Sequence, residues 1–355
     1  GLYIADSTSV RMRIDGNGQV HGRVRSDRIA LGNRYLRNLR LSIDGRDSNL
    51  DLVLNSDELA FPPLLMRSDR IMVLASEDSF GMSVAFDNDT EPVNKGELFL
   101  RGGFSRDDQD RLVTDISILP SNIYVNSNAW SLSPADIRLN GGRVSIHGLT
   151  LDNESQSIRI DGAYDRTAGD SLTVQLEHFD IAALQPLLPG GMTISGYADG
   201  TGVLQSTGEP TPGLLLNLGI TDCMLAGRPA GELSLSSSYN KEAEGFDVSV
   251  RNSLDGHSNI VATALLGLRD KVLDGRIGLS EFDLGYAYPF LSSVFSEFGG
   301  LLSGSIRVSG PLSSLEISSN RLRLDDGLMK VDFTGVPYKV SGPLRLDNGG
   351  AWFMD

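Results

Sequence analysis

The sequence contains few of the residues on which catalytic and metal chemistry depends. One cysteine, Cys223, occurs in 355 residues, which excludes an internal disulfide and a cysteine-rich zinc site. Its apolar neighbours predict a buried side chain. Four histidines are scattered without metal-ligand spacing, at His21, His147, His178 and His257. A nucleophile elbow and a Walker loop are also missing. We therefore predict a protein that is not an enzyme and that has no cofactor and no metal.

Basic charge and long apolar runs are scarce as well. Lys and Arg total 31 against 46 Asp and Glu, a formal net charge of −15. Phosphate binding needs a basic face, so we predict no nucleic-acid partner. No stretch reaches the roughly 18 apolar residues of a membrane-spanning helix. Aromatic residues are 7%, with only two tryptophans, which argues against a sugar-binding surface lined by exposed rings.

What the sequence does have is two-residue alternation of apolar and polar side chains. Val10, Met12 and Ile14 alternate with Arg11 and Arg13, and similar segments recur to the C-terminal end. Alternate side chains of a strand point to opposite faces, so each such strand has one apolar and one wet face. Glycine is also frequent, with 40 residues, which indicates many turns. These features predict an all-β fold of many short strands.

Asp-Gly and Asn-Gly dipeptides separate many of these segments and predict tight hairpin turns. Seven Asp-Gly pairs occur, beginning at Asp15, Asp44, Asp161, Asp199, Asp255, Asp274 and Asp326. Three Asn-Gly pairs begin at Asn17, Asn140 and Asn348. The acidic cluster at residues 107–110 is interpreted as another hairpin tip.

Only two segments have helical spacing, residues 181–188 and 288–298. A Phe-Asp pair precedes each segment, and Ser-Gly follows each, at Ser195-Gly196 and Ser303-Gly304. This similarity predicts an internal repeat of roughly 100 to 110 residues. We divide the chain into an N-terminal β region, 1–120, and two β modules, 121–225 and 226–355. We expect a piece of a longer protein, because the sequence begins and ends within the alternating pattern.

The C-terminal part, residues 302–350, contains Gly310-Pro311-Leu312, Asp326-Gly327 and Gly335-Val336-Pro337-Tyr338. This arrangement resembles the recurring unit of the TamB family, and residues 128–162 and 179–200 resemble its AsmA-like layers. The resemblance implies a β-taco, a long curved sheet that forms an apolar trough. It also implies a periplasmic segment of a protein anchored in the inner membrane of a Gram-negative-type envelope. The implied partners are phospholipid acyl chains and an outer-membrane Omp85-type barrel protein.

The strand pattern agrees with such a trough. On the order of 25 strands at about 4.8 Å each would extend a single sheet to on the order of 100 Å. Either two sheets pack face to face, or one sheet curls around an apolar ligand such as a lipid. The residues expected to line the trough are Val144, Ile146, Ile158, Ile160, Leu172, Val174, Leu176, Leu214, Leu216, Leu218, Ile306, Val308, Leu322, Leu324, Val331 and Phe333.

The sequence thus predicts a segment that shields lipid acyl chains for phospholipid transport and outer-membrane biogenesis. Two alternatives stay open. One is a scaffold that guides outer-membrane β-barrel strands by its sheet edges. The other is a glycan-binding or glycan-active β protein, because a catalytic pair of carboxylates needs to meet only in space.

Overall fold

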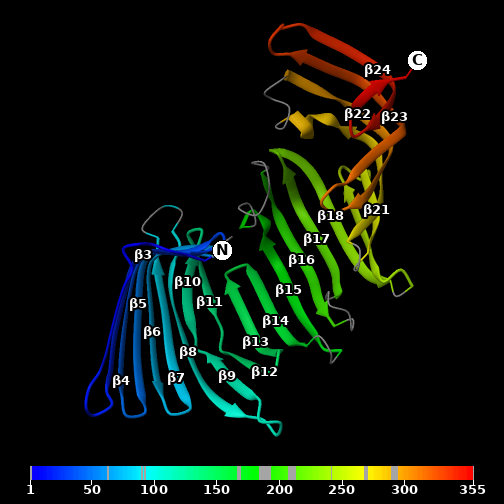
Figure 1. Ribbon diagram of the computed structural model, residues 1–355. Coiled ribbons are helices and arrows are strands. Elements are labelled where there is room, and N and C mark those ends of the chain that lie inside the picture. The colour runs from blue at the N-terminus through cyan, green and yellow to red at the C-terminus, as the bar shows by residue number, and fades with distance from the viewer. Residues whose placement is uncertain are drawn as a thin grey trace. The chain divides into compact units, whose positions relative to one another are not determined.

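The computed structural model confirms the all-β prediction. It describes residues 2–61, 64–88, 91, 93–165, 169–183, 193–206, 213–240, 242–267, 271–288 and 295–354. Strands comprise 79% of the described residues, whose helical content is two short 3-10 turns. Contacts divide the chain into two units, Gly1–Val174 and Gln175–Asp355 (Figure 1). The predicted boundaries at 120/121 and 225/226 each fall inside a unit.

Unit 1 is an antiparallel sheet in which most strands pair with the strands that precede and follow them in the chain. Its strands are β1 (Leu2–Ile4), β2 (Ser9–Ile14), β3 (Val20–Leu31), β4 (Arg34–Arg46), β5 (Asn49–Phe61), β6 (Leu64–Ser76), β7 (Ser79–Asp87), β8 (Lys95–Arg106), β9 (Leu112–Ile118), β10 (Ser121–Val125), β11 (Asn128–Leu132), β12 (Ala135–Asn140), β13 (Arg143–Asn153) and β14 (Gln156–Tyr164). Strand β15 (Ser171–Asp180) crosses the boundary between the units.

Two prolines interrupt strands in the middle of unit 1. Pro120 separates β9 from β10, which both pair with β8, and Pro134 separates β11 from β12, which both pair with β13. Proline has no backbone N–H to give to a ladder, so pairing stops there and resumes one or two residues later. Leu119-Pro120 is therefore a break within a paired ribbon.

Unit 2 is an antiparallel meander. Its elements are β16 (Ile194–Gln205), β17 (Gly213–Leu225), β18 (Arg228–Asn240), β19 (Gly245–Ser253), β20 (Ile260–Gly267), β21 (Val272–Asp283), the 3-10 turn η3 (Leu284–Ala287), β22 (Phe295–Pro311), β23 (Glu316–Val331), β24 (Pro337–Asp347) and β25 (Gly350–Phe353). From β16 to β25 each strand pairs antiparallel with the next.

The structure describes only part of each predicted helix, and it contradicts the prediction at residues 295–298, which are in a strand. The first is a 3-10 turn at residues 181–183, and residues 184–192 lie outside the described part of the chain. The second 3-10 turn, η3, ends before the predicted helix begins, and residues 295–298 open strand β22. Phe295 pairs with Val331, and Phe298 pairs with Met329. Cross-strand pairing thus overrides the helical spacing of the two phenylalanines, and residues 289–294 are not described.

Five of the seven Asp-Gly pairs lie inside strands, which corrects the prediction of hairpin turns. Those at Asp44, Asp161, Asp199, Asp274 and Asp326 are in strands, whereas those at Asp15 and Asp255 are in turns. All three Asn-Gly pairs are at turns. Residues 107–110 form the predicted turn between β8 and β9, where hydrogen bonds from Arg111 hold the pKa of Asp107 at about 2.

Some of the Asp-Gly pairs belong to a bulge that recurs along the sheet. A strand residue with positive φ donates its backbone N–H to an Asp or Ser side chain of another strand, and a glycine with φ above 110° follows that acceptor. The four donor–acceptor pairs are Gly148–Asp161 (2.9 Å), His178–Asp199 (2.7 Å), Glu281–Ser303 (2.9 Å) and Asp326–Ser341 (3.1 Å). The acceptor satisfies an N–H that the bulge removes from the ladder.

These bulges show the predicted repeat, with a corrected alignment. Asp180 accepts from the N–H of Ala182 at 2.9 Å, and Asp283 accepts from Gly285 at 2.7 Å. Asp199-Gly200, and not Ser195-Gly196, corresponds to Ser303-Gly304, because each pair holds the bulge of its module. Gly200 and Gly304 have φ of 139° and 133°. The repeat length is 104 residues from Gly200 to Gly304, within the predicted range.

Buried core is sparse in both units. Among the described residues sixteen hydrophobic side chains are buried, and seven of them form two small clusters, around Leu324 in unit 2 and around Ile118 in unit 1. The chain exposes 21,216 Å². A compact monomer of 38.2 kDa would expose about 14,000 Å². Much of the apolar surface therefore packs only against neighbours in its own sheet.

We predict that Gly304→Ala loosens β22 and β23. Gly304 has φ of 133°, and a Cβ there would overlap the carbonyl oxygen of Arg321. We expect a loss of about 1–3 kcal/mol in local stability, measured as faster hydrogen exchange in peptides from β22 and β23. Gly81→Ala is the matched control, because a Cβ at Gly81 meets open space. Equal exchange in the two variants would contradict the assignment.

Candidate functional site

The apolar side chains of unit 1 form continuous rows across its strands. Antiparallel pairing places them directly opposite one another on one face. One row consists of Ile43, Leu52, Val73, Met82, Leu100, Ile118 and Ala135. A second row consists of Leu41, Leu54, Ile71, Val84 and Leu98. Most of these residues are half-buried, so hydrocarbon is neither sealed in a core nor fully in water.

Unit 2 has an equivalent row. It consists of Leu218, Leu235, Val250, Ala262, Ile277 and Ile306. All six side chains are half-buried. The row crosses six paired strands without a polar residue, so a ligand that lies across the strands would meet hydrocarbon throughout.

The structure places most of the predicted lining residues at half-buried positions. These are Val144, Ile146, Ile158, Ile160, Leu172, Val174, Leu176, Leu216, Leu218, Ile306, Val308 and Val331. Leu214 is exposed. The structure brings Val144 and Ile146 together with Leu139 and Ile137 on the paired strand. It also brings Ile158 and Ile160 together with Leu151 and Leu149.

Three predicted lining residues have different surroundings. Leu322 and Leu324 are 4% and 1% exposed and pack in a closed cluster with Leu302 and Leu344. Phe333 is 97% exposed in the turn after β23. Alternation in sequence selects the correct face of β23, but only the neighbouring strands decide which positions on that face are covered.

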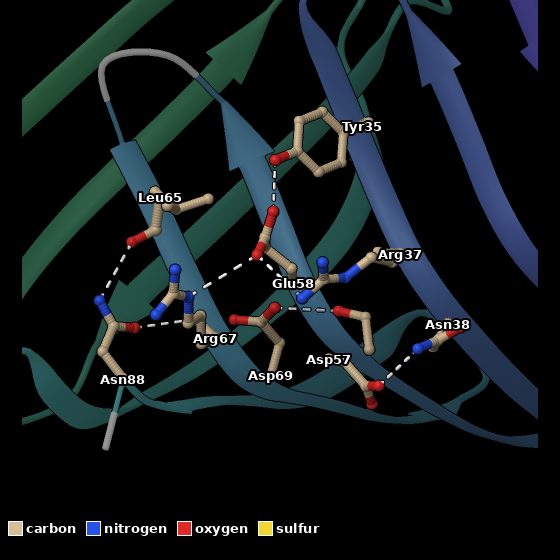
Figure 2. A network of polar contacts seen from close by, with 10 residues as sticks. Tyr35, Arg37, Asn38, Asp57, Glu58, Leu65, Arg67, Asp69 and Asn88 are labelled. Carbon is tan, nitrogen blue, oxygen red and sulfur yellow. Dashed lines mark hydrogen bonds and ion pairs between the residues drawn. The ribbon is translucent and has the colours of Figure 1, made fainter. Parts of the chain in front are cut away.

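A polar cluster interrupts the apolar face of unit 1 near one end of β4, β5 and β6. Glu58 is buried and accepts a hydrogen bond from the Tyr35 hydroxyl. Its Oε2 is 3.1 Å from Arg37 Nη2 and 3.6 Å from Arg67 Nε. Figure 2 shows these three side chains gathered around the Glu58 carboxylate. The hydrogen bond to Glu58 raises the pKa of Tyr35.

The cluster belongs to the same face as the apolar rows. Arg28, Arg37, Glu58 and Arg67 are successive cross-strand partners, two positions beyond the row that contains Ser56 and Asp69. The guanidinium groups of Arg37 and Arg67 therefore flank one buried carboxylate, and the Arg28 guanidinium lies over the Tyr35 ring, 4.7 Å from its centroid. We did not predict this cluster, although the signal was present: these charged residues occupy inward positions of the two-residue alternation.

Asp69 is the most deeply buried carboxylate of this region. It is 2% exposed, and its Oδ2 accepts from Ser56 Oγ at 2.9 Å, whereas Oδ1 lacks a partner in hydrogen-bonding geometry. Burial raises the pKa of Asp69, and the Ser56 hydrogen bond opposes that shift only in part. The Asp69 carboxyl group therefore binds a proton more readily than an aspartate in water does.

The described residues contain no group of three or more His, Cys, Asp or Glu side chains arranged to hold a metal ion. No helix in the described part of the chain has the length and apolar composition needed to cross a membrane. No protein-family model and no solved structure matches the chain. The candidate site is therefore defined by its geometry alone. It is a half-buried apolar face, and in unit 1 the polar cluster around Glu58 lies near one end of that face.

We predict that Asp69→Asn stabilises unit 1 most at high pH. The raised pKa means that the folded state binds a proton more tightly than the unfolded state, so the wild-type contribution falls as pH rises through the native pKa. Thermal unfolding at pH 5 and pH 8 should show a gain at pH 8 of about 1–3 kcal/mol, the usual cost of an unsatisfied buried polar group.

Asp51→Asn is the control, because Asp51 is exposed on the neighbouring strand β5. A gain for Asp69→Asn that is independent of pH, or a similar gain for Asp51→Asn, would contradict the ionisation argument.

Proposed function

We propose that this chain is a periplasmic segment of a TamB/AsmA-like protein, and that its apolar sheet face shields lipid acyl chains on their way between two membranes. The observation that carries the proposal is the set of apolar rows that stay in register across many paired strands and remain half-buried. A core residue of a sealed sandwich would be covered by a second layer, whereas these rows leave hydrocarbon accessible.

The energetics suit an acyl chain. Each methylene removed from water contributes about 0.8 kcal/mol, so a 16-carbon chain in water is disfavoured by on the order of 10 kcal/mol. Rows of leucine, isoleucine and valine side chains offset that cost wherever the acyl chain lies on the face. Successive rows are chemically alike, so a lipid meets similar free energies at successive positions and can move along the face without a deep trap.

The two arginines of the polar cluster in unit 1 suit the phosphate end of a phospholipid. Arg37 and Arg67 are about half exposed, at 53% and 42%, while the Glu58 between them is 8% exposed. A phosphate near the two guanidinium groups would form charge-assisted hydrogen bonds. The partners under this proposal are phospholipids and, as the sequence resemblance implies, an outer-membrane Omp85-type barrel protein. The role is non-catalytic, with no cofactor.

The proposal is tested by site-specific photo-crosslinking on the two faces of β17. Leu218 lies on the apolar row, and Asn217 is exposed on the opposite face of the same strand. A benzophenone amino acid at Leu218 should capture phospholipid in the cell envelope, identified by mass spectrometry, and the same group at Asn217 should capture at least about tenfold less.

Equal capture at both positions, or no lipid at Leu218, would overturn the proposal. Capture of nascent outer-membrane strands instead of lipid would favour the scaffold alternative. Capture of glycan would favour the glycan-binding or glycan-active alternative.

Charge placed on the apolar row should block lipid passage. We predict that Leu218→Asp or Ile306→Asp abolishes lipid co-purification, whereas Asn217→Asp leaves it unchanged, because only the first two bury a carboxylate against hydrocarbon. Circular dichroism must show the same strand content in all three proteins. Wild-type lipid content in Leu218→Asp and Ile306→Asp would count against an open lipid path.

A further inference from the structure

Unit 2 contains a cavity of about 550 Å³ that neither the apolar row nor the bulges explain. Residues of β16 to β21 and of η3 line it. Its apolar part includes Ile194, Leu225, Leu233, Val250, Ile260 and Phe282. Drug-sized ligands occupy cavities of roughly 300–1,000 Å³, so this volume is sufficient for one small apolar molecule or one alkyl chain.

An ion pair and a hydrogen bond hold the turn η3 against one side of this cavity. Arg228 Nη1 is 2.7 Å from Asp283 Oδ2, and the Tyr286 hydroxyl donates to the carbonyl oxygen of Pro229. The rings of Tyr286 and Phe282 stack with centroids 5.4 Å apart. Gly285 has no side chain, and a Cβ there would overlap the Arg228 guanidinium. The ion pair is about half exposed, so water can reach this side of the cavity.

The floor and the rim of the cavity differ in chemistry. Cys223 is 1% exposed and lies among the lining residues, which confirms the predicted burial of this side chain. Asp255 and Glu281 also line the cavity but are exposed. Because Asp283 is paired with Arg228, these two carboxylates leave the rim with negative charge. The cavity therefore combines a hydrocarbon interior with an acidic entrance.

One polar atom of the lining lacks a hydrogen bond. Asn259 donates its side-chain N–H to the carbonyl oxygen of Ser280 at 3.0 Å, but its buried Oδ1 accepts no hydrogen bond from the described residues. The protein covers this oxygen, so a molecule in the cavity does not reach it. The acidic rim is therefore the feature that selects the charge of a ligand's polar end.

We propose that this cavity binds a single alkyl chain whose polar end is uncharged or cationic. The choice of an alkyl chain rests on the proposed lipid function, and the cavity adds to it a discrete site in which one chain can rest. The apolar lining contacts the chain, and the rim contacts the polar end. An anionic single-chain lipid is disfavoured by Asp255 and Glu281.

Cys223 supplies the measurement, because it is the only cysteine in the chain. Because Cys223 is 1% exposed, N-ethylmaleimide reaches it only in transiently opened forms of unit 2, and an alkyl chain in the cavity should slow this labelling further. We expect n-decylamine, used below its critical micelle concentration, and n-decanol, used below its solubility limit, to protect at least about tenfold better than decanoate. Each added methylene from octylamine to decylamine should raise the affinity about fourfold. Protection that is absent, independent of chain length or equal for the three head groups would overturn the proposal.

Two variants separate cavity binding from non-specific adsorption. Leu233→Trp fills the cavity and should remove protection by n-decylamine. Asp255→Asn keeps the positive-φ turn, which asparagine tolerates, and should bring decanoate closer to n-decylamine. Asp332→Asn, an exposed change in another turn, should alter neither. If Leu233→Trp does not fold, the Asp255→Asn variant still tests the proposal. If the three ligands protect this variant in the same order and to the same extent as wild type, the acidic rim does not select the ligand.

This experiment is independent of the crosslinking test at Leu218. If only the cavity proposal is wrong, the ligands will not protect Cys223, but Leu218 will still capture lipid. If only the transport proposal is wrong, the ligands will protect Cys223, but Leu218 will capture no lipid.

Discussion

The register of antiparallel pairing is the constraint on which the rest of this structure depends. A slip of one residue between two strands would turn every inward leucine or valine of one strand toward water. Across β4 to β9, partners such as Ile43 and Leu52, or Met82 and Leu100, remain directly opposite one another. Because each strand mainly contacts its two neighbours, the apolar face is assembled locally, pair by pair, without a large central core.

Bulges change strand geometry without breaking that register over long distances. A residue such as His178 or Glu281 takes positive φ, and a side chain from another strand accepts its freed N–H. The following glycine allows the close backbone approach that a Cβ would prevent. The recurrence of this device 103 residues apart, at His178 and Glu281, indicates that the modules share one folding solution as well as a similar sequence.

The departures from apolar alternation are where chemical specificity enters. Glu58 sits between Arg37 and Arg67 on a face that is otherwise hydrocarbon, and Asp69 is buried beside Ser56. In unit 2 the equivalent departure is a cavity with an acidic rim. Under the proposed lipid function, a uniform face would let an acyl chain move, whereas charged side chains or a cavity would give one end of an amphiphile a preferred position. The two kinds of feature would then be complementary.

Three properties could be predicted from the sequence alone: the all-β class, the inward and outward faces of most strands, and a repeat near 100 residues. These properties follow from side-chain alternation and from local similarity, which do not depend on distant residues. The sequence did not determine whether Asp199-Gly200 makes a hairpin or a bulge, because the same tolerance of positive φ serves both. It also misplaced a helix at Phe295, where pairing with β23 outweighs helical spacing. The burial of Leu324, the accessibility of Leu218 and the position of Cys223 beside a cavity are visible only in the folded chain. Those outcomes depend on which strands lie alongside, and that information is spread over residues far apart in the chain.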